Sequence, residues 1–155
     1  GIFVRKVTNS ILMKDYLKYW RVVRYFIKSK YGLTTADLDM LLFLNSEGYF
    51  SKDDFYEFNE LLSWDKNRFE NLRTNGWIEV FRKNKGKQKA IYQLSYKTNR
   101  VITSIYNKLE GEEIPESPSS NPMFLRKVSY TDKVYRNYIK DMNKSTRQPQ
   151  HPSRK

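Results

Sequence analysis

The residues from Arg82 to Lys89 carry a high density of positive charge for a chain turn. Five of these eight residues are Lys or Arg, and the tip reads NKGK. Strand-forming runs at 77–82 and 90–94 flank the tip, and Gly86 permits a sharp turn, so the segment predicts a β-hairpin. A hairpin does not need this charge to fold. Cationic side chains that project from a turn could instead displace counterions from nucleic-acid phosphates.

A second candidate site lies just before the hairpin. Ser63 as N-cap and Gly76 as stop predict a helix over 64–75, with Phe69 and Leu72 facing inward. Asn can pair with adenine and Glu can accept from cytosine, so the opposite face could read base edges in a major groove. The alternative is an ordinary solvated helix face. The candidate base-reading residues are Lys66, Asn67, Glu70 and Asn71.

Cationic residues on both elements are candidates for contacts with the DNA backbone. Arg68 and Arg73 could instead pair with Glu70 or Asp65, and the hairpin charge could serve only solubility. We expect Trp64 and Trp77 to be core residues rather than base-stacking residues. The candidate backbone contacts are Arg68, Arg73, Arg82, Lys83, Lys85, Lys87 and Lys89.

The charge of the whole chain favours a polyanionic partner. The net charge is +12 and the pI is near 9.8, which indicates nucleic acid first and an anionic membrane surface second. Residues 80–109 contain eight basic and no acidic residues, whereas residues 33–62 contain seven acids and one Lys. The positive charge is therefore concentrated rather than spread evenly.

The composition argues against an enzyme or a metal protein. The chain has no Cys, and its one His, His151, lies in a polar tail, so thiolate chemistry, Ser-His-Asp catalysis and His-rich metal sites are not expected. No nucleotide-binding glycine loop is present, and we expect no cofactor. No run of about 18 apolar residues and no secretory signal is visible, which predicts a cytoplasmic protein without a membrane partner.

Hydrophobic periodicity and caps predict the elements that position these residues. Thr34 with Asp37 and Ser51 with Asp54 form two predicted capping boxes. The expected order is helix, helix, short helix, helix, basic hairpin and helix, which is typical of a winged helix-turn-helix. The fold class is therefore mainly α with a small β-hairpin wing and long terminal helices. The expected helices are 10–31, 35–45, 52–61, 64–75, 96–109 and 131–143.

These elements suggest a division of the chain. We expect an N-terminal arm and long dimerisation helix (1–32), a DNA-binding lobe (33–94) and a helix after the wing (95–110). These are followed by a linker rich in Pro, Ser and Glu (111–122), a C-terminal dimerisation helix (123–144) and a disordered basic tail (145–155).

Three segments resemble the MarR-type winged-helix regulators. LTTADLDMLLFL is similar to the start of that family's second helix, FENLRTNGWIEVF to the end of its recognition helix, and YQLSYKTNRVITSIYNKL to its second wing strand and following long helix. The resemblance covers 33–111. It implies a dimer that binds two half-sites of double-stranded DNA, often with a small ligand between the lobes, although nothing in this sequence supports an effector.

The chain departs from that family pattern in three places. Family wings usually carry an Asp/Arg pair near the tip, whereas NKGKQK has neither, so Lys must supply a less specific contact. Trp64 and Asp65 stand where the family tends to have small residues. The helix over 52–61 is acidic and would repel phosphate if it faced DNA.

The terminal helices predict a homodimer. The helix over 10–31 is apolar around much of its circumference, and a helix apolar on more than one face needs more than one partner. The C-terminal helix offers a second apolar stripe. In the alternative arrangement the chain is a monomer whose C-terminal helix folds back over the first. The candidate interface residues are Leu12, Tyr16, Trp20, Val23, Ile27, Val134, Tyr135, Tyr138 and Ile139.

The sequence thus predicts a dimeric, MarR-like transcription regulator that acts in a bacterial cytoplasm, or a phage protein acting in a bacterial host. One alternative is a winged-helix module for replication, plasmid or phage DNA handling without a regulatory role. Another is a winged helix that contacts an acidic protein rather than DNA.

Overall fold

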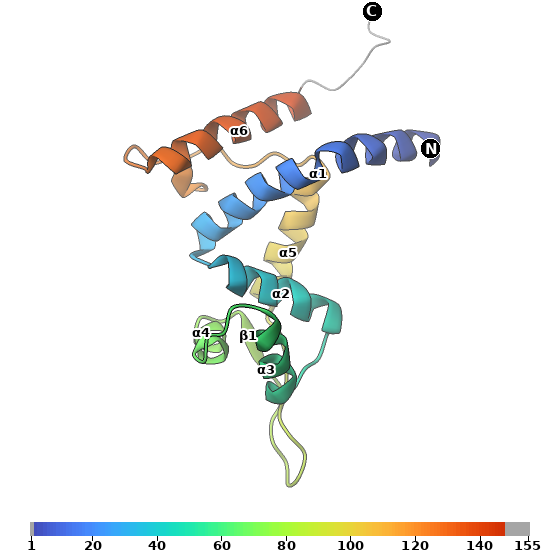
Figure 1. The fold of residues 1–155 in the computed structure, drawn as a ribbon, viewed down its shortest axis with the longest axis vertical. Coiled ribbons are helices and arrows are strands. Elements are labelled where there is room, and N and C mark those ends of the chain that lie inside the picture. Colours follow the sequence, from blue (N-terminus) through green and yellow to red (C-terminus); the bar gives the residue numbers. More distant parts are fainter. Residues whose placement is uncertain (1, 148–155) are drawn as a thin grey trace, which may run out of the picture. The chain divides into compact units, whose positions relative to one another are not determined.

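The computed structural model describes the backbone of residues 2–147 and the side chains of residues 16–146 (Figure 1). The chain forms two compact units: one contains the residues up to Gly32 together with those from Ile105 onward, and the other is Leu33–Ser104. In chain order the elements are α1 (Ile2–Tyr31), α2 (Thr35–Glu47), α3 (Lys52–Leu61), α4 (Arg68–Thr74), β1 (Ile78–Arg82), β2 (Ile91–Leu94), α5 (Tyr96–Leu109), the short 3₁₀ helix η1 (Pro122–Phe124) and α6 (Tyr130–Arg147).

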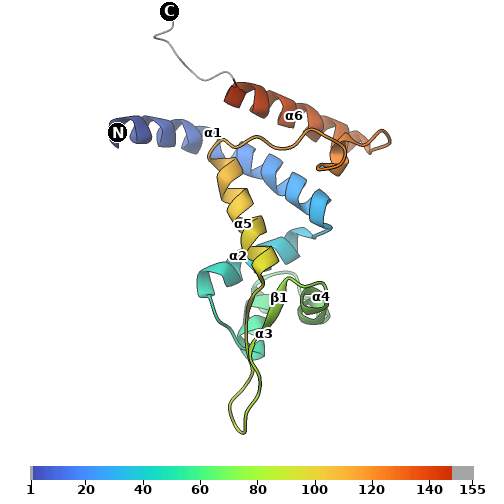
Figure 2. The same ribbon diagram turned by 180° about the vertical axis from the view of Figure 1, so that it is seen from behind.

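The predicted fold class is confirmed: the described chain is mainly helical, with one two-stranded antiparallel sheet. In the unit Leu33–Ser104, which we call the lobe, β1 pairs with β2, and Ile78 lies opposite Leu94. Phe50 extends this sheet by an isolated antiparallel β-bridge, in which its backbone exchanges two hydrogen bonds with Tyr92 (3.1 and 2.8 Å). This arrangement of α2, α3, α4 and a hairpin is a winged helix-turn-helix, and the hairpin loop projects from it (Figure 2).

Aromatic packing joins the lobe's helices to the hairpin. Phe69 of α4 meets the rings of Phe55 in α3 (5.1 Å between centroids) and Tyr92 in β2 (5.0 Å), both edge-on. Edge-to-face pairs are favourable because the positive edge of one ring meets the negative face of the other. Phe69 and Leu72 are buried, as predicted, so this face of α4 is fixed against the sheet.

The caps explain where the lobe's helices begin. The predicted capping box of α3 is confirmed: the Ser51 hydroxyl accepts from the Asp54 backbone, and the Asp54 carboxylate accepts from the Ser51 backbone. Only half of the predicted box of α2 forms. Thr34 accepts from the Asp37 backbone (3.0 Å), but the Asp37 carboxylate binds Arg68 instead.

In the other unit, which we call the terminal unit, α6 packs against α1. The rings of Tyr25 and Tyr135 stack at 3.9 Å, and the Tyr25 hydroxyl donates to Asp132 at 2.6 Å. Burial and this hydrogen bond together raise the pKa of Tyr25 to about 12. The phenol therefore stays protonated as a donor well above neutral pH.

This packing changes the set of residues that could form a dimer. Val23, Ile27 and Ile139 are buried within a single chain, so their assignment to a dimer interface is wrong. Tyr16 and Tyr138 are exposed, and Leu12 lies outside the described side chains. The remaining candidates are half-buried: Trp20, Val134 and Tyr135.

The segment 111–122, predicted to be a linker, is instead packed into the terminal unit. Ile114 is buried, and Asn143 of α6 holds its backbone from both sides, accepting from the amide at 2.9 Å and donating to the carbonyl at 2.7 Å. Asn143 also donates to Glu116 at 2.8 Å. Within the segment, the buried Asn121 also donates to the Pro115 carbonyl at 2.8 Å. The Pro- and Ser-rich composition did not reveal this packing, because a few scattered side chains and the distant Asn143 hold the segment.

The ends of the terminal helices also differ from the prediction. α1 begins at Ile2 rather than Ser10, so the expected N-terminal arm is helical. α6 ends at Arg147, so residues 145–147 of the expected disordered tail belong to the helix. The rest of that predicted tail, 148–155, lies outside the described residues.

We predict that Asn143→Ala destabilises the protein by about 2–3 kcal/mol, because it leaves the buried Ile114 amide and carbonyl without partners. Urea unfolding monitored by circular dichroism would measure the loss. Asn137→Ala, at an exposed position of the same helix, is the matched control and should unfold as the wild type does. Equal stability of the two variants would contradict a structural role for Asn143.

Candidate nucleic-acid interface

The predicted recognition helix is shorter than expected. It was predicted over 64–75, but α4 spans Arg68–Thr74. The Asp65 carboxylate accepts from the Asn67 backbone at 2.9 Å, and the Asp65 carbonyl accepts from the Arg68 backbone at 3.2 Å. Asp competes for backbone donors in this way and favours turns over helix. Residues 64–67 therefore form a loop that leads into α4, and Ser63 does not cap the helix.

Arg68 holds this loop in place. Its guanidinium is buried and donates to the Asp37 carboxylate at 2.9 Å, to the Ser63 carbonyl at 2.8 Å, and to the Asn59 side chain. Asn59, also buried, donates to the Asp65 carbonyl at 3.1 Å. One side chain thus joins the first turn of α2, the helix α3 and the loop before α4.

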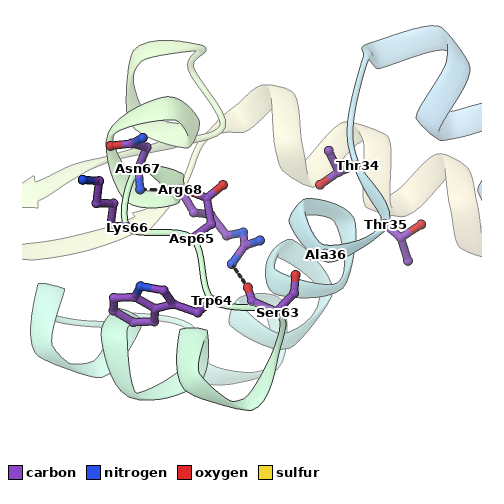
Figure 3. A pocket seen from close by; sticks show the side chains of 9 residues that line it. All are labelled: Thr34, Thr35, Ala36, Ser63, Trp64, Asp65, Lys66, Asn67 and Arg68. Atoms are coloured by element: carbon purple, nitrogen blue, oxygen red, sulfur yellow. Dashed lines mark hydrogen bonds between the residues drawn. The ribbon is translucent and has the colours of Figure 1, made fainter.

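This burial corrects one predicted contact. Arg68 was predicted to bind DNA phosphate, but its side chain points into the lobe, toward the Ser63 carbonyl (Figure 3). The alternative interpretation, that Arg68 pairs with an acid of its own chain, agrees better with the structure. The acid is Asp37, however, rather than Glu70 or Asp65. Asp37 lies 31 residues away, which is why local spacing did not reveal it.

The remaining candidates on α4 and its leading loop form one exposed group. Arg73 and Glu70 pair with each other at 2.8 Å. Their hydrogen bond lowers the pKa of Glu70 and raises the pKa of Arg73, so both stay charged at neutral pH. An exposed pair of this kind is weak and can be exchanged for a new partner. The exposed group comprises Lys66, Asn67, Glu70, Asn71 and Arg73.

Trp64 is a surface residue of this loop, contrary to the prediction. Its side chain is 62% exposed, whereas Trp77 is buried at 4% as predicted. In Figure 3 the indole lies on the side of Lys66 and Asn67, away from α2. A large exposed aromatic beside polar groups is a common feature of binding surfaces. The loop and α2 line an open hollow, formed by Thr34, Thr35, Ala36, Ser63, Trp64, Asp65, Lys66, Asn67 and Arg68.

The hairpin forms as predicted and presents its cations to solvent. Lys85 and Gln88 exchange two backbone hydrogen bonds (3.1 and 3.0 Å) around the tip, and Gly86 adopts a positive φ of 61°. A residue with a side chain is strained in that conformation, which accounts for a Gly there. The exposed basic residues are Arg82, Lys83, Lys85, Lys87 and Lys89.

Lys89 differs from the other wing cations because it has an acidic partner. It forms an ion pair with Asp53 of α3, and this contact raises the pKa of Lys89. The pair partly neutralises the acidic helix that the sequence suggested would repel phosphate. Within the described residues, the other four wing cations form no ion pair.

Metal and membrane features are absent from the part of the chain that the structure describes. No cluster of three or more His, Asp or Glu side chains there could hold a metal ion. None of the helices described is both long and apolar enough to cross a membrane.

The lobe therefore belongs to the winged helix-turn-helix class of architecture, with an exposed α4 face and a basic wing. No family model matches the chain, and no curated protein matches it. The crystal structure of AbfR of Staphylococcus epidermidis is similar at 14% identity, with a TM-score of 0.44 over 94% of this chain and 96% of that chain. The structure of disulfide-formed AbfR gives 14% identity and a TM-score of 0.40, over 96% and 97%. Likeness at this level assigns no function to any residue here.

We predict that Arg68→Ala destabilises the lobe by about 2–4 kcal/mol, because it leaves Asn59 and the partly buried Asp37 without their shared donor. Chemical unfolding would measure this loss. Lys66→Ala, in the same loop but exposed, should leave the unfolding midpoint unchanged. A stable Arg68→Ala protein would show that the network does not hold the loop.

Proposed function

We propose that the chain is a DNA-binding protein of the MarR-like regulator type, acting as a dimer on double-stranded DNA in a bacterial or phage-infected cell. The observation that carries this proposal is the wing. Arg82, Lys83, Lys85 and Lys87 stand on a projecting hairpin without acidic partners among the described residues. Arg82 donates one hydrogen bond to the Lys89 carbonyl at 3.5 Å, but no acid among the described residues neutralises the four charges. Duplex DNA is a partner of matching charge and extent.

α4 and its leading loop supply the sequence-reading part of the proposal. The exposed Asn67 and Asn71 lie four residues apart, at the start of α4 and one turn into it. A recognition helix presents its N-terminal half to base edges in the major groove. The exposed Trp64 would then meet DNA as well, since it lies on the same side of the loop as Asn67 (Figure 3). An apolar ring suits contact with a thymine methyl group.

Replacing Lys85 and Lys87 with Ala should weaken binding to all duplex DNA about equally and lower the salt slope of log K by up to about 2. Fluorescence anisotropy over a range of salt concentrations would measure the slope. The Lys85→Arg, Lys87→Arg variant keeps both charges and serves as control. An unchanged slope in the alanine variant would exclude phosphate contact by the wing.

Asn67→Ala or Asn71→Ala should relax the preference at one base position of the site, at a cost of about 1–3 kcal/mol there. Selection of bound fragments from random DNA, with wild type and each variant, would reveal the change. A wild-type consensus that is an inverted repeat supports a regulator. A uniform loss of affinity across sequences would reassign these Asn residues to backbone contact.

The dimer part of the proposal rests on the apolar surface left on α1. Leu17 is 79% exposed and Tyr16 is 43% exposed, and a second copy of the chain could cover both. Leu17→Glu should then shift the protein from dimer to monomer in sedimentation equilibrium. Leu61→Glu, at the similarly exposed Leu61 of the lobe (71%), is the matched control. A wild-type monomer at micromolar concentration would rule out the dimer.

One observation favours a second candidate function. The stacking of Tyr135 on Tyr25 places α6 over α1 within one chain, which is the monomeric arrangement that the sequence left open. A monomeric winged helix would suit replication, plasmid or phage DNA handling without a palindromic operator. Fragment selection separates the two, because binding without a consensus supports this second function.

A further inference from the structure

The net positive charge of the protein lies almost wholly outside the winged-helix lobe. The lobe, residues 33–104, contains 11 Lys and Arg against 10 Asp and Glu, for a net charge of +1. The remaining residues, 1–32 and 105–155, contain 18 against 7, for a net charge of +11. The proposed function of the lobe and its wing therefore does not account for most of the charge.

Part of this charge forms a regular stripe along α6. Four cations recur at steps of three and four residues, which places them on one face of a helix. Three of them are exposed, and Arg136 is half-buried with its guanidinium 5.9 Å from the Phe124 ring centre. We call this set the α6 stripe, which consists of Lys133, Arg136, Lys140 and Lys144.

The charge of the stripe is not neutralised by the described residues, although Arg136 and Lys140 lie over the Phe124 ring, at 5.9 and 6.0 Å from its centre. Within the described residues, none of its four cations forms an ion pair with a carboxylate. Of the two acids on α6, Asp132 accepts the Tyr25 hydroxyl. Asp141 lies three residues before Lys144, at the edge of the stripe, and leaves a local net charge of +3 there. Uncompensated charge on one helix face favours a polyanionic partner.

The other side of α6 argues against a membrane surface. A helix that binds a lipid interface must have a free apolar face to bury among the acyl chains. In α6 that side is already occupied, since Ile139 is fully buried, Tyr135 stacks on Tyr25, and the buried Asn143 holds the Ile114 backbone. Apart from Tyr130 and Tyr138, the exposed surface of α6 is polar and mainly basic, and it offers no continuous apolar face.

The shape of the stripe argues for an extended partner rather than a small anion. Lys133 and Lys144 are 11 residues apart, which corresponds to roughly 16 Å along a helix. A small anion needs cations that converge on one point, whereas these lie in a line. Duplex DNA offers a line of phosphates at high charge density, and point-like Lys charges suit contact without base recognition.

We propose that the α6 stripe is a second nucleic-acid contact surface, which binds the phosphate backbone of duplex DNA independently of the wing. The phosphate contacts of the stripe add affinity that does not depend on DNA sequence to the affinity that the lobe provides. This inference goes beyond the function proposed for the lobe, and it stands even if α4 reads no base.

The test compares four forms of the full-length chain on a duplex of random sequence, by fluorescence anisotropy across a salt series. They are the wild type, the wing variant Lys85→Ala with Lys87→Ala, the stripe variant Lys133→Ala with Lys140→Ala and Lys144→Ala, and the two sets combined. The stripe variant should lower the salt slope by about 2–3, and the combined variant should lose the sum of the two effects. Base preference in fragment selection should not change in the stripe variant.

Three controls keep the outcome specific. Replacing the same three Lys residues with Arg keeps the charge and should keep the slope. The isosteric changes Asn45→Asp, Asn99→Asp and Asn107→Asp lower the net charge equally at exposed positions of α2 and α5, and should lower the slope far less. Asp141→Asn removes the acid beside Lys144 and should strengthen binding. Circular dichroism of each variant verifies that it is folded.

Two results would overturn the proposal. The first is a stripe variant whose salt slope and affinity equal those of the wild type. The second is a stripe that prefers another polyanion, shown by stripe-dependent binding of phosphatidylserine vesicles or polyglutamate that is tighter than binding of duplex DNA at equal salt. Failure of the lobe's proposed function would look different, because it would remove the wing effect and the base preference and leave the stripe effect intact.

Discussion

The buried guanidinium of Arg68 is the interaction on which the candidate interface depends. It binds Asp37 at the start of α2, Asn59 in α3 and the carbonyl of Ser63. A buried charge is tolerated only where it is paired and fully hydrogen-bonded, and no buried side-chain polar atom among the described residues lacks a partner. Because the network needs all three elements in place, it fixes where α4 begins and which of its side chains face solvent.

The lobe and the terminal unit use charge in different ways. In the lobe, Arg68, Arg73 and Lys89 are balanced by acids, whereas the wing cations Arg82, Lys83, Lys85 and Lys87 form no ion pair among the described residues. In the terminal unit, the α6 stripe is left without acidic partners while tyrosine stacking and Asn143 hold the helix. The cations that pair with acids stabilise the fold, and the unpaired cations of the wing and the stripe remain available to phosphate. Because the lobe is nearly neutral, it would bind DNA weakly alone, and the proposed dimer and the stripe would each add affinity.

Much of the fold could be predicted because local signals agreed with the tertiary structure. The capping box of Ser51 and Asp54 gave α3 its start, and the glycine at the wing tip gave the hairpin its turn. The errors came from contacts between residues far apart in sequence. Asp37 was read as a cap although it binds Arg68, and 111–122 was read as a linker although Asn143 anchors it. Trp64 was expected in the core but is exposed, since no local pattern reports whether a loop residue faces solvent.

The most direct test of the central claim, that α4 and the wing form a DNA-binding surface, is an NMR titration of the ¹⁵N-labelled full-length protein with duplex DNA. The structure predicts that amide shifts in the lobe concentrate in the loop and helix 64–73 and in the wing 82–89. It also predicts little change in the buried contacts of Phe55 and Phe69, because the aromatic core should not rearrange. Binding that left both 64–73 and 82–89 unshifted would contradict the claim.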